Sequence, residues 1–95
     1  MKKATFQIGL PITIFKEGKS YVAYSPALDL STSASTYLKA RSRFSEVTKI
    51  FFEELTEMGT LESVLASLGW QKLKTNWHPP VVVSNYTQSI NLTNA

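Results

Sequence analysis

The spacing of apolar residues changes once along this chain, at residues 35–36, from a period of two to a period of three to four residues. Within residues 5–15, the even positions are all large and apolar: Phe6, Ile8, Leu10, Ile12 and Ile14. Alternation of this kind predicts a half-buried β-strand over residues 5–15. Pro11 cannot donate to a sheet ladder, so it indicates an edge strand or a bend within the strand.

Two further strands are predicted before the change of period. Residues 16–19 read as a hairpin turn, because Gly18 adopts positive φ without steric penalty. Residues 21–25 are β-prone and are followed by Pro26, which ends the return strand. Residues 28–33 again place apolar or β-branched side chains at alternate positions. The first third of the chain is therefore expected to form a three-stranded antiparallel meander.

After residue 36 the apolar residues form one stripe along a predicted long helix: Tyr37, Ala40, Phe44, Val47, Phe51, Leu55 and Met58. Gly59 is a good residue to end this helix. Thr60 is then expected to cap a second, short helix, which Gly69 ends in the same way. Both helices are expected to pack on one face of the sheet, which makes the predicted fold class α+β.

The signal weakens after Trp70. Residues 72–76 are polar, residues 78–80 are extended or looped, and residues 81–83 are strand-like but short. Residues 89–93 alternate Ile90 and Leu92, so they are predicted to form a final strand that returns to the sheet. Neither an internal repeat nor a Gly/Ser-rich or charged linker divides the chain. Residues 1–95 are therefore expected to form a single domain.

Composition and charge exclude several classes of protein. The chain of 95 residues has no Cys, which removes disulfides, thiolate metal sites and thiol nucleophiles. Its net charge is +3, and the basic residues are scattered rather than gathered into a nucleic-acid-binding face. No apolar run is long enough to span a bilayer, and the N-terminus lacks the features of a secretory signal. A cytoplasmic location without membrane association is expected.

The sequence contains few candidate catalytic residues. Asp29 is the only Asp and His78 the only His, and most Glu residues fall at solvent-facing helical positions. No glycine-rich phosphate loop or framed serine nucleophile occurs. One His without Cys does not make a standard zinc site. The chain is expected to be no enzyme and to hold no metal or cofactor.

A chain of this size has a small core, which often needs support from self-association. Phe52 lies at the margin of the helical stripe, adjacent to Phe51. It either widens the buried face of the helix or packs across a subunit interface, where aromatic residues are enriched. A homodimer or a higher even-numbered oligomer is predicted.

An ordered series of short segments carries a family resemblance. The segments are Phe15-Lys-Glu-Gly-Lys-Ser-Tyr21-Val-Ala-Tyr24-Ser-Pro26-Ala-Leu28-Asp29, Ser35-Thr36, Gly59-Thr60-Leu61-Glu62 and Leu68-Gly69-Trp70. Over residues 12–70 this series resembles the HicB-like antitoxin family.

The resemblance implies a partial RNase H-like fold, no catalytic activity, self-association and neutralisation of a small mRNA-cleaving HicA-type toxin. Many relatives carry a separate C-terminal domain that binds operator DNA. The 25 residues after Trp70 show no helical period. Neither a separate DNA-binding domain nor DNA binding is therefore expected here.

The segment from Tyr21 to Asp29 is the predicted partner-binding site, through Tyr21, Tyr24, Pro26 and Asp29. Tyrosines give large contact area at low entropic cost, and a carboxylate suits a cationic partner. Strand alternation places the two tyrosines on opposite faces, so one of them is expected to be exposed beside Asp29. Two alternatives stay open: Asp29 caps its own turn, or the chain is an RNA-binding or scaffolding protein without a toxin, with bases stacked on exposed tyrosines.

Overall fold

The computed structural model describes residues 8–93. It contains an α+β arrangement, which confirms the predicted fold class. The elements in chain order are β1 (Thr13–Glu17), β2 (Ser20–Ser25), β3 (Leu30–Ala34), α1 (Tyr37–Met58), α2 (Leu61–Ser67), β4 (Gln71–Leu73) and β5 (Asn76–His78).

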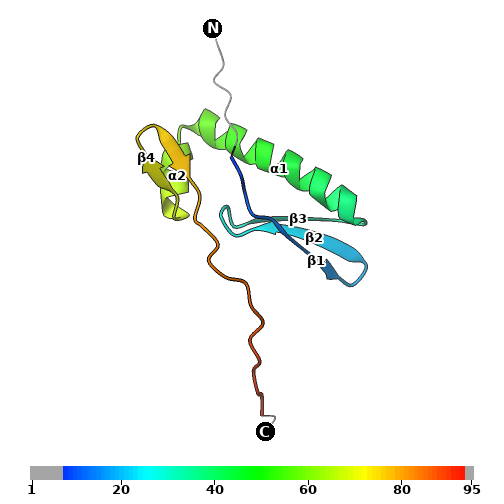
Figure 1. Ribbon diagram of the computed structural model, residues 1–95. Helices are drawn as coiled ribbons and strands as arrows, with labels where there is room; N and C mark the ends of the chain where they lie inside the picture. Colours follow the sequence, from blue (N-terminus) through cyan, green and yellow to red (C-terminus); the bar gives the residue numbers. More distant parts are fainter. Residues whose placement is uncertain (1–7, 94–95) are drawn as a thin grey trace.

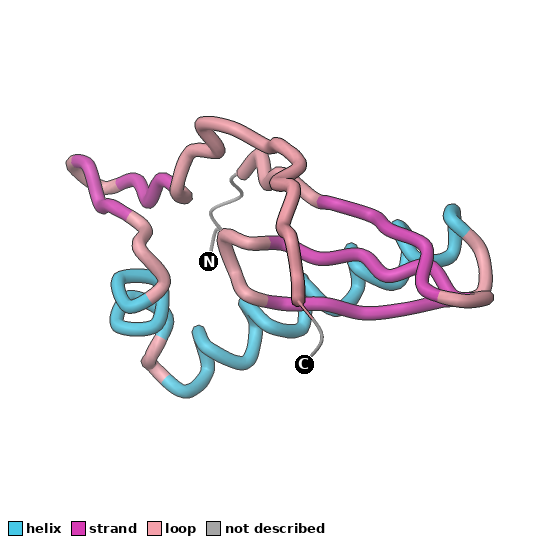
Figure 2. Tube along the Cα trace, turned by 90° about the horizontal axis from the view of Figure 1, so that it is seen from below, coloured by secondary structure: helices cyan, strands magenta, loops and turns pink. Residues whose placement is uncertain are grey.

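The first three strands form an antiparallel sheet in the order β1-β2-β3, and α1 runs across one face of it (Figure 1). Gly18 has φ of 61° and joins β1 to β2 in a tight hairpin in which Glu17 pairs with Ser20. Seen along the perpendicular direction, the strands lie side by side with the helix behind them (Figure 2). The predicted meander is therefore confirmed.

The first strand is shorter than the alternation predicts. Pairing begins only at Thr13, and residues 8–12 have no regular secondary structure. Pro11 explains the limit, because its nitrogen has no hydrogen to donate to a neighbouring strand. Phe6, which begins the predicted apolar series, lies outside the described residues.

The third strand begins two residues later than predicted. Ala27 and Leu28 are buried in a turn rather than paired in the sheet. Asp29 then adopts φ of 49°, a left-handed conformation that no strand residue can hold. Strand pairing therefore starts at Leu30, opposite Ser25.

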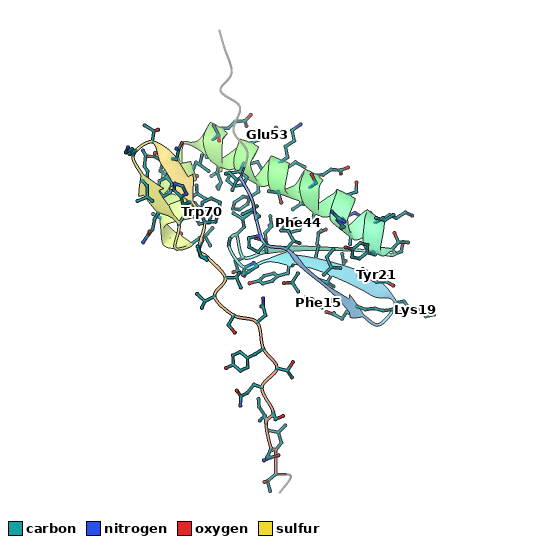
Figure 3. The ribbon with its side chains drawn as sticks, viewed as in Figure 1. Phe15, Lys19, Tyr21, Phe44, Glu53 and Trp70 are labelled. Atoms are coloured by element: carbon teal, nitrogen blue, oxygen red, sulfur yellow. The ribbon has the colours of Figure 1, made fainter. Side chains whose placement is uncertain are left out.

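Helix α1 begins and ends where its local chemistry predicts. The Oγ1 atom of Thr36 accepts a hydrogen bond from the backbone nitrogen of Lys39 at 3.1 Å, and Gly59 takes the left-handed conformation with φ of 70°. Ala40 and Phe44 of the predicted stripe are buried against the sheet, where they form a first core cluster with Ala23 and Ala34. Figure 3 shows the Phe44 ring between the helix and the sheet.

A second core cluster lies at the other end of the molecule. It consists of Ala27, Leu28, Leu65 and Trp70, with Phe51 and Phe52 among the half-buried side chains packed on it. Helix α2 contributes Leu65, and Gly69 ends this helix with φ of 90°. The predicted side-chain cap at Thr60 is wrong, since its Oγ1 atom makes no hydrogen bond.

The C-terminal region differs most from expectation. The polar residues 72–76, for which the sequence predicts no element, lie in the hairpin β4–β5, which turns at Lys74 with φ of 60°. The predicted strand at residues 89–93 is absent: residues 79–93 have no regular structure and extend away from the sheet (Figure 1). The alternation of Ile90 and Leu92 therefore meets no partner strand in the described chain. No helix within residues 8–93 is both long and apolar enough to cross a bilayer.

Candidate functional site

The two tyrosines of β2 lie on opposite faces of the sheet. Tyr21 shares the helix-facing side with Ala23 and packs against the first core cluster. Nζ of Lys16 lies 5.8 Å from the centre of the Tyr21 ring. Tyr24 is on the other face, the one that α1 does not cover. The expected division of the tyrosines between the two faces is therefore observed, and Tyr24 is the outward one.

Tyr24 and Asp29 meet on that face. The Tyr24 hydroxyl donates a hydrogen bond to Oδ1 of Asp29 at 3.1 Å, and the Asp29 side chain is exposed. This hydrogen bond, with some desolvation and the negative charge of Asp29, raises the pKa of Tyr24 above its ordinary value. The hydroxyl therefore stays protonated and donating across physiological pH, while the carboxylate keeps its remaining lone pairs free for another donor.

The turn that carries Asp29 packs on the second core cluster. Nε1 of the buried Trp70 donates to the backbone oxygen of Ala27 at 2.8 Å, and Leu28 packs in the same cluster. Pro26, another predicted contact residue, is exposed at the start of this turn and fixes the backbone there. The turn that carries Asp29 is therefore held to the second core cluster by a hydrogen bond and by apolar packing.

Beside this pair lies a shallow groove of about 660 Å³, lined partly by Phe15, Val22 and Tyr24. Phe15 and Val22 are register partners in neighbouring strands, and the Phe15 side chain remains 44% exposed. Nη1 of Arg43 donates to the backbone oxygen of Ser33 at 2.9 Å and forms part of the groove wall. The rest of the lining is polar and consists of Glu17, Ser31, Thr32 and Ser33. The groove is therefore a short apolar strip bordered by hydroxyl groups, by the Glu17 carboxylate and by the Arg43 guanidinium, and Asp29 lies beside it through its hydrogen bond with Tyr24.

Phe15 and Arg43 were not identified by sequence reasoning. Phe15 occupies an odd position in a segment whose apolar residues are otherwise at even ones, and this break in the alternation is the signal that points to the second face. Arg43 carries no comparable signal, because its place on the polar side of the helix is typical of solvated residues. Only the packing of α1 over β3 brings it to the groove.

Phe52, the predicted interface residue, lies away from this groove. Its ring is 5.7 Å from that of Phe51 and 6.3 Å from that of Trp70, both edge-on. It is half-buried in the second core cluster. Packing within one chain therefore accounts for most of its apolar surface.

The basic side chains are dispersed over several elements. Lys16, Arg41 and Lys72 each lie about 6 Å from the centre of an aromatic ring, on β1, α1 and β4 respectively. Lys72 also donates to Oε2 of Glu62 at 2.7 Å, which lowers the pKa of this carboxyl group. Within residues 8–93, no three His, Asp or Glu side chains gather where they could hold a metal ion.

Comparison with protein-family models, with curated proteins and with solved structures found no match to this chain. What the structure shows is the fold class: a small α+β chain with a three-stranded antiparallel sheet, one long helix across it and the Tyr24–Asp29 hydrogen bond on the opposite face.

Proposed function

We propose that this chain is a HicB-like, antitoxin-type binding protein of the cytoplasm, which neutralises a small mRNA-cleaving HicA-type toxin by contact and has no catalytic activity of its own. The observation that carries the proposal is the Tyr24–Asp29 hydrogen bond on the uncovered face of the sheet. Proteins that handle RNA carry arginine and lysine for phosphate contacts, and a preorganised carboxylate beside an aromatic ring suits such side chains.

The groove supports a protein partner in particular. Phe15, Val22 and Tyr24 supply a partly exposed apolar strip, and Asp29 adds a carboxylate beside it through its hydrogen bond with Tyr24. Aromatic anchors beside a charged group are typical of binding hot spots. Single-stranded RNA, the alternative ligand, would require several cations beside stacking rings, and the three cation–ring pairs lie on separate elements. The observations therefore favour a protein over a nucleic acid.

The test is a titration of the chain with a HicA-type toxin. Asp29→Asn removes the charge but keeps a residue that tolerates the left-handed conformation, so the fold is retained. We expect the affinity to fall about tenfold or more, because the partner's cation loses its counter-charge. Tyr24→Phe removes only the hydroxyl and should weaken binding less. Glu53→Gln, on the solvent-facing side of α1, is the matched control and should bind as the wild type does.

Two results would contradict this assignment. If Asp29→Asn and Glu53→Gln bind equally well, the toxin contacts another surface. If the wild-type chain does not bind the toxin but binds single-stranded RNA, the RNA-binding alternative is correct. Incubation of the chain alone with that RNA and Mg²⁺ should leave the RNA intact.

A further inference from the structure

The C-terminal tail, defined as residues 79–93, is unusual for a small soluble domain. It contains no charged residue, and it is exposed over nearly its whole length. Val83 and Leu92 are 93% and 86% exposed, although both are apolar. A β-branched, uncharged segment of this kind is suited to strand pairing and is unfavourable when left in water.

A groove of about 740 Å³ lies between α1 and the segment that leads into β1, and one of its walls is apolar. One wall carries the alternate residues Ile8, Leu10, Ile12 and Ile14. The opposite wall is α1, from Tyr37 to Thr48. The groove is open because α1 packs chiefly over β3 and β2, which leaves the helix-facing side of β1 without a cover.

The groove also borders an unpaired sheet edge. In the order β1-β2-β3, the outer backbone groups of β1 have no neighbouring strand among the described residues. The other edge is partly covered, since Arg43 donates to the backbone oxygen of Ser33 in β3. An extended peptide can add to an open edge of this kind through main-chain hydrogen bonds, while alternate side chains fill the adjacent pocket.

The tail of the same copy is poorly placed to fill this groove. It leaves β5 and runs away on the side of the sheet opposite α1, whereas α1 forms one wall of the groove (Figures 1 and 2). A second copy has no such restriction. Residues 81–93 span about 40 Å when extended, long enough to cross a subunit boundary and pair along β1.

We propose that residues 81–93 of one copy add as a strand to the β1 edge of a second copy and place their apolar side chains in its groove. Reciprocal exchange about a two-fold axis gives a closed dimer in which both tails and both edges are covered. This exchange specifies how the predicted self-association is built. It requires neither a toxin nor the Tyr24–Asp29 site, so the two proposals can fail separately.

The first test is the mass of the full chain in solution, by light scattering. We expect a dimer, and Ile90→Lys with Leu92→Lys should weaken it at least about tenfold, because two buried apolar side chains are lost from each tail. Met58→Lys is the matched control: Met58 and Ile90 are each 70% exposed, but Met58 lies at the end of α1 away from the groove. A monomeric wild type, or a dimer that survives both tail substitutions, would overturn the proposal.

The second test locates the tail by cross-linking introduced cysteines. The sequence itself has no cysteine, so only the introduced ones can react. One chain carries Ser45→Cys in the groove wall, and a distinguishable chain carries Asn91→Cys in the tail. A short bis-maleimide reagent should join the two chains in a mixture. A chain with Glu53→Cys in place of Ser45→Cys should not be joined, because Glu53 points away from the sheet (Figure 3).

A chain that carries both Ser45→Cys and Asn91→Cys tests whether the tail binds the groove of its own copy instead. Linkage only within that chain would mean that each tail folds back on its own groove, and would refute the exchange. If the tail variant with both Ile90→Lys and Leu92→Lys is monomeric yet still binds a toxin through Asp29, both proposals stand. If it is monomeric and Asp29→Asn has no effect on toxin binding, only the exchange stands.

Discussion

At the scale of single residues, Trp70 links the interior to the candidate site. Its Nε1–H bond to the oxygen of Ala27 is the buried side-chain hydrogen bond that ties the end of the helical region to the turn before Asp29. Its ring also packs edge-on against Phe52. A buried carbonyl that loses its only donor keeps the full desolvation penalty, so this bond matters more than its net strength suggests.

Trp70→Phe should therefore lower the free energy of unfolding by about 1–3 kcal/mol, because Ala27 O is left unpaired and the smaller ring leaves space. Chemical denaturation measures the change. Trp77→Phe is the control, since it makes the same change of side chain at a position that is only half-buried. Equal effects of the two substitutions would show that the Ala27 contact contributes little.

At the scale of elements, each helix begins after a threonine, but only the hydroxyl of Thr36 caps its helix. Thr36 is extended and its hydroxyl accepts from the nitrogen of Lys39, as a helix cap does. Thr60 has ψ near zero, and its Oγ1 atom is buried without a hydrogen-bond partner. The backbone conformation before each helix decides which hydroxyl reaches the first turn.

We expect Thr36→Ala to lower the free energy of unfolding by about 1 kcal/mol, the usual value of a lost cap. Thr60→Ala should be neutral or slightly stabilising, because it removes an unpaired buried oxygen. Thermal unfolding of the two variants beside the wild type measures the contrast. A larger loss for Thr60→Ala than for Thr36→Ala would contradict the assignment of the caps.

At the scale of the whole molecule, two core clusters support one fold. The first lies between α1 and the sheet, and the second lies among α2, Trp70 and the turn at Ala27 and Leu28. Leu30, at the start of β3, packs against both. This shared side chain couples the sheet to the helical end, and with it the site at Asp29.

Leu30→Ala should loosen both clusters, at a loss of about 2 kcal/mol, the lower end for a leucine that is only half-buried. Hydrogen exchange should show weaker protection of amides in β2 and in α2 alike. Leu61→Ala is the matched control, because Leu61 is also half-buried but packs on the second cluster alone. Unchanged protection of β2 in the Leu30→Ala variant would mean that the clusters are independent.

The sequence by itself determined the elements whose signals are local. The β propensity of residues 21–25, the helical stripe from Tyr37, the turn glycine Gly18 and the helix stop at Gly59 each depend on residues within a few positions of one another. Neighbouring residues set backbone preference and side-chain direction, so these features can be read without knowing the fold.

Only the tertiary structure decided which surfaces meet. It placed Tyr24 rather than Tyr21 beside Asp29, brought Arg43 to the groove and left Ile90 without a partner strand. Alternation shows that a segment can form a strand, but pairing depends on a distant edge that is free and within reach. Contacts between distant segments follow from packing of the whole chain, and no local pattern encodes them.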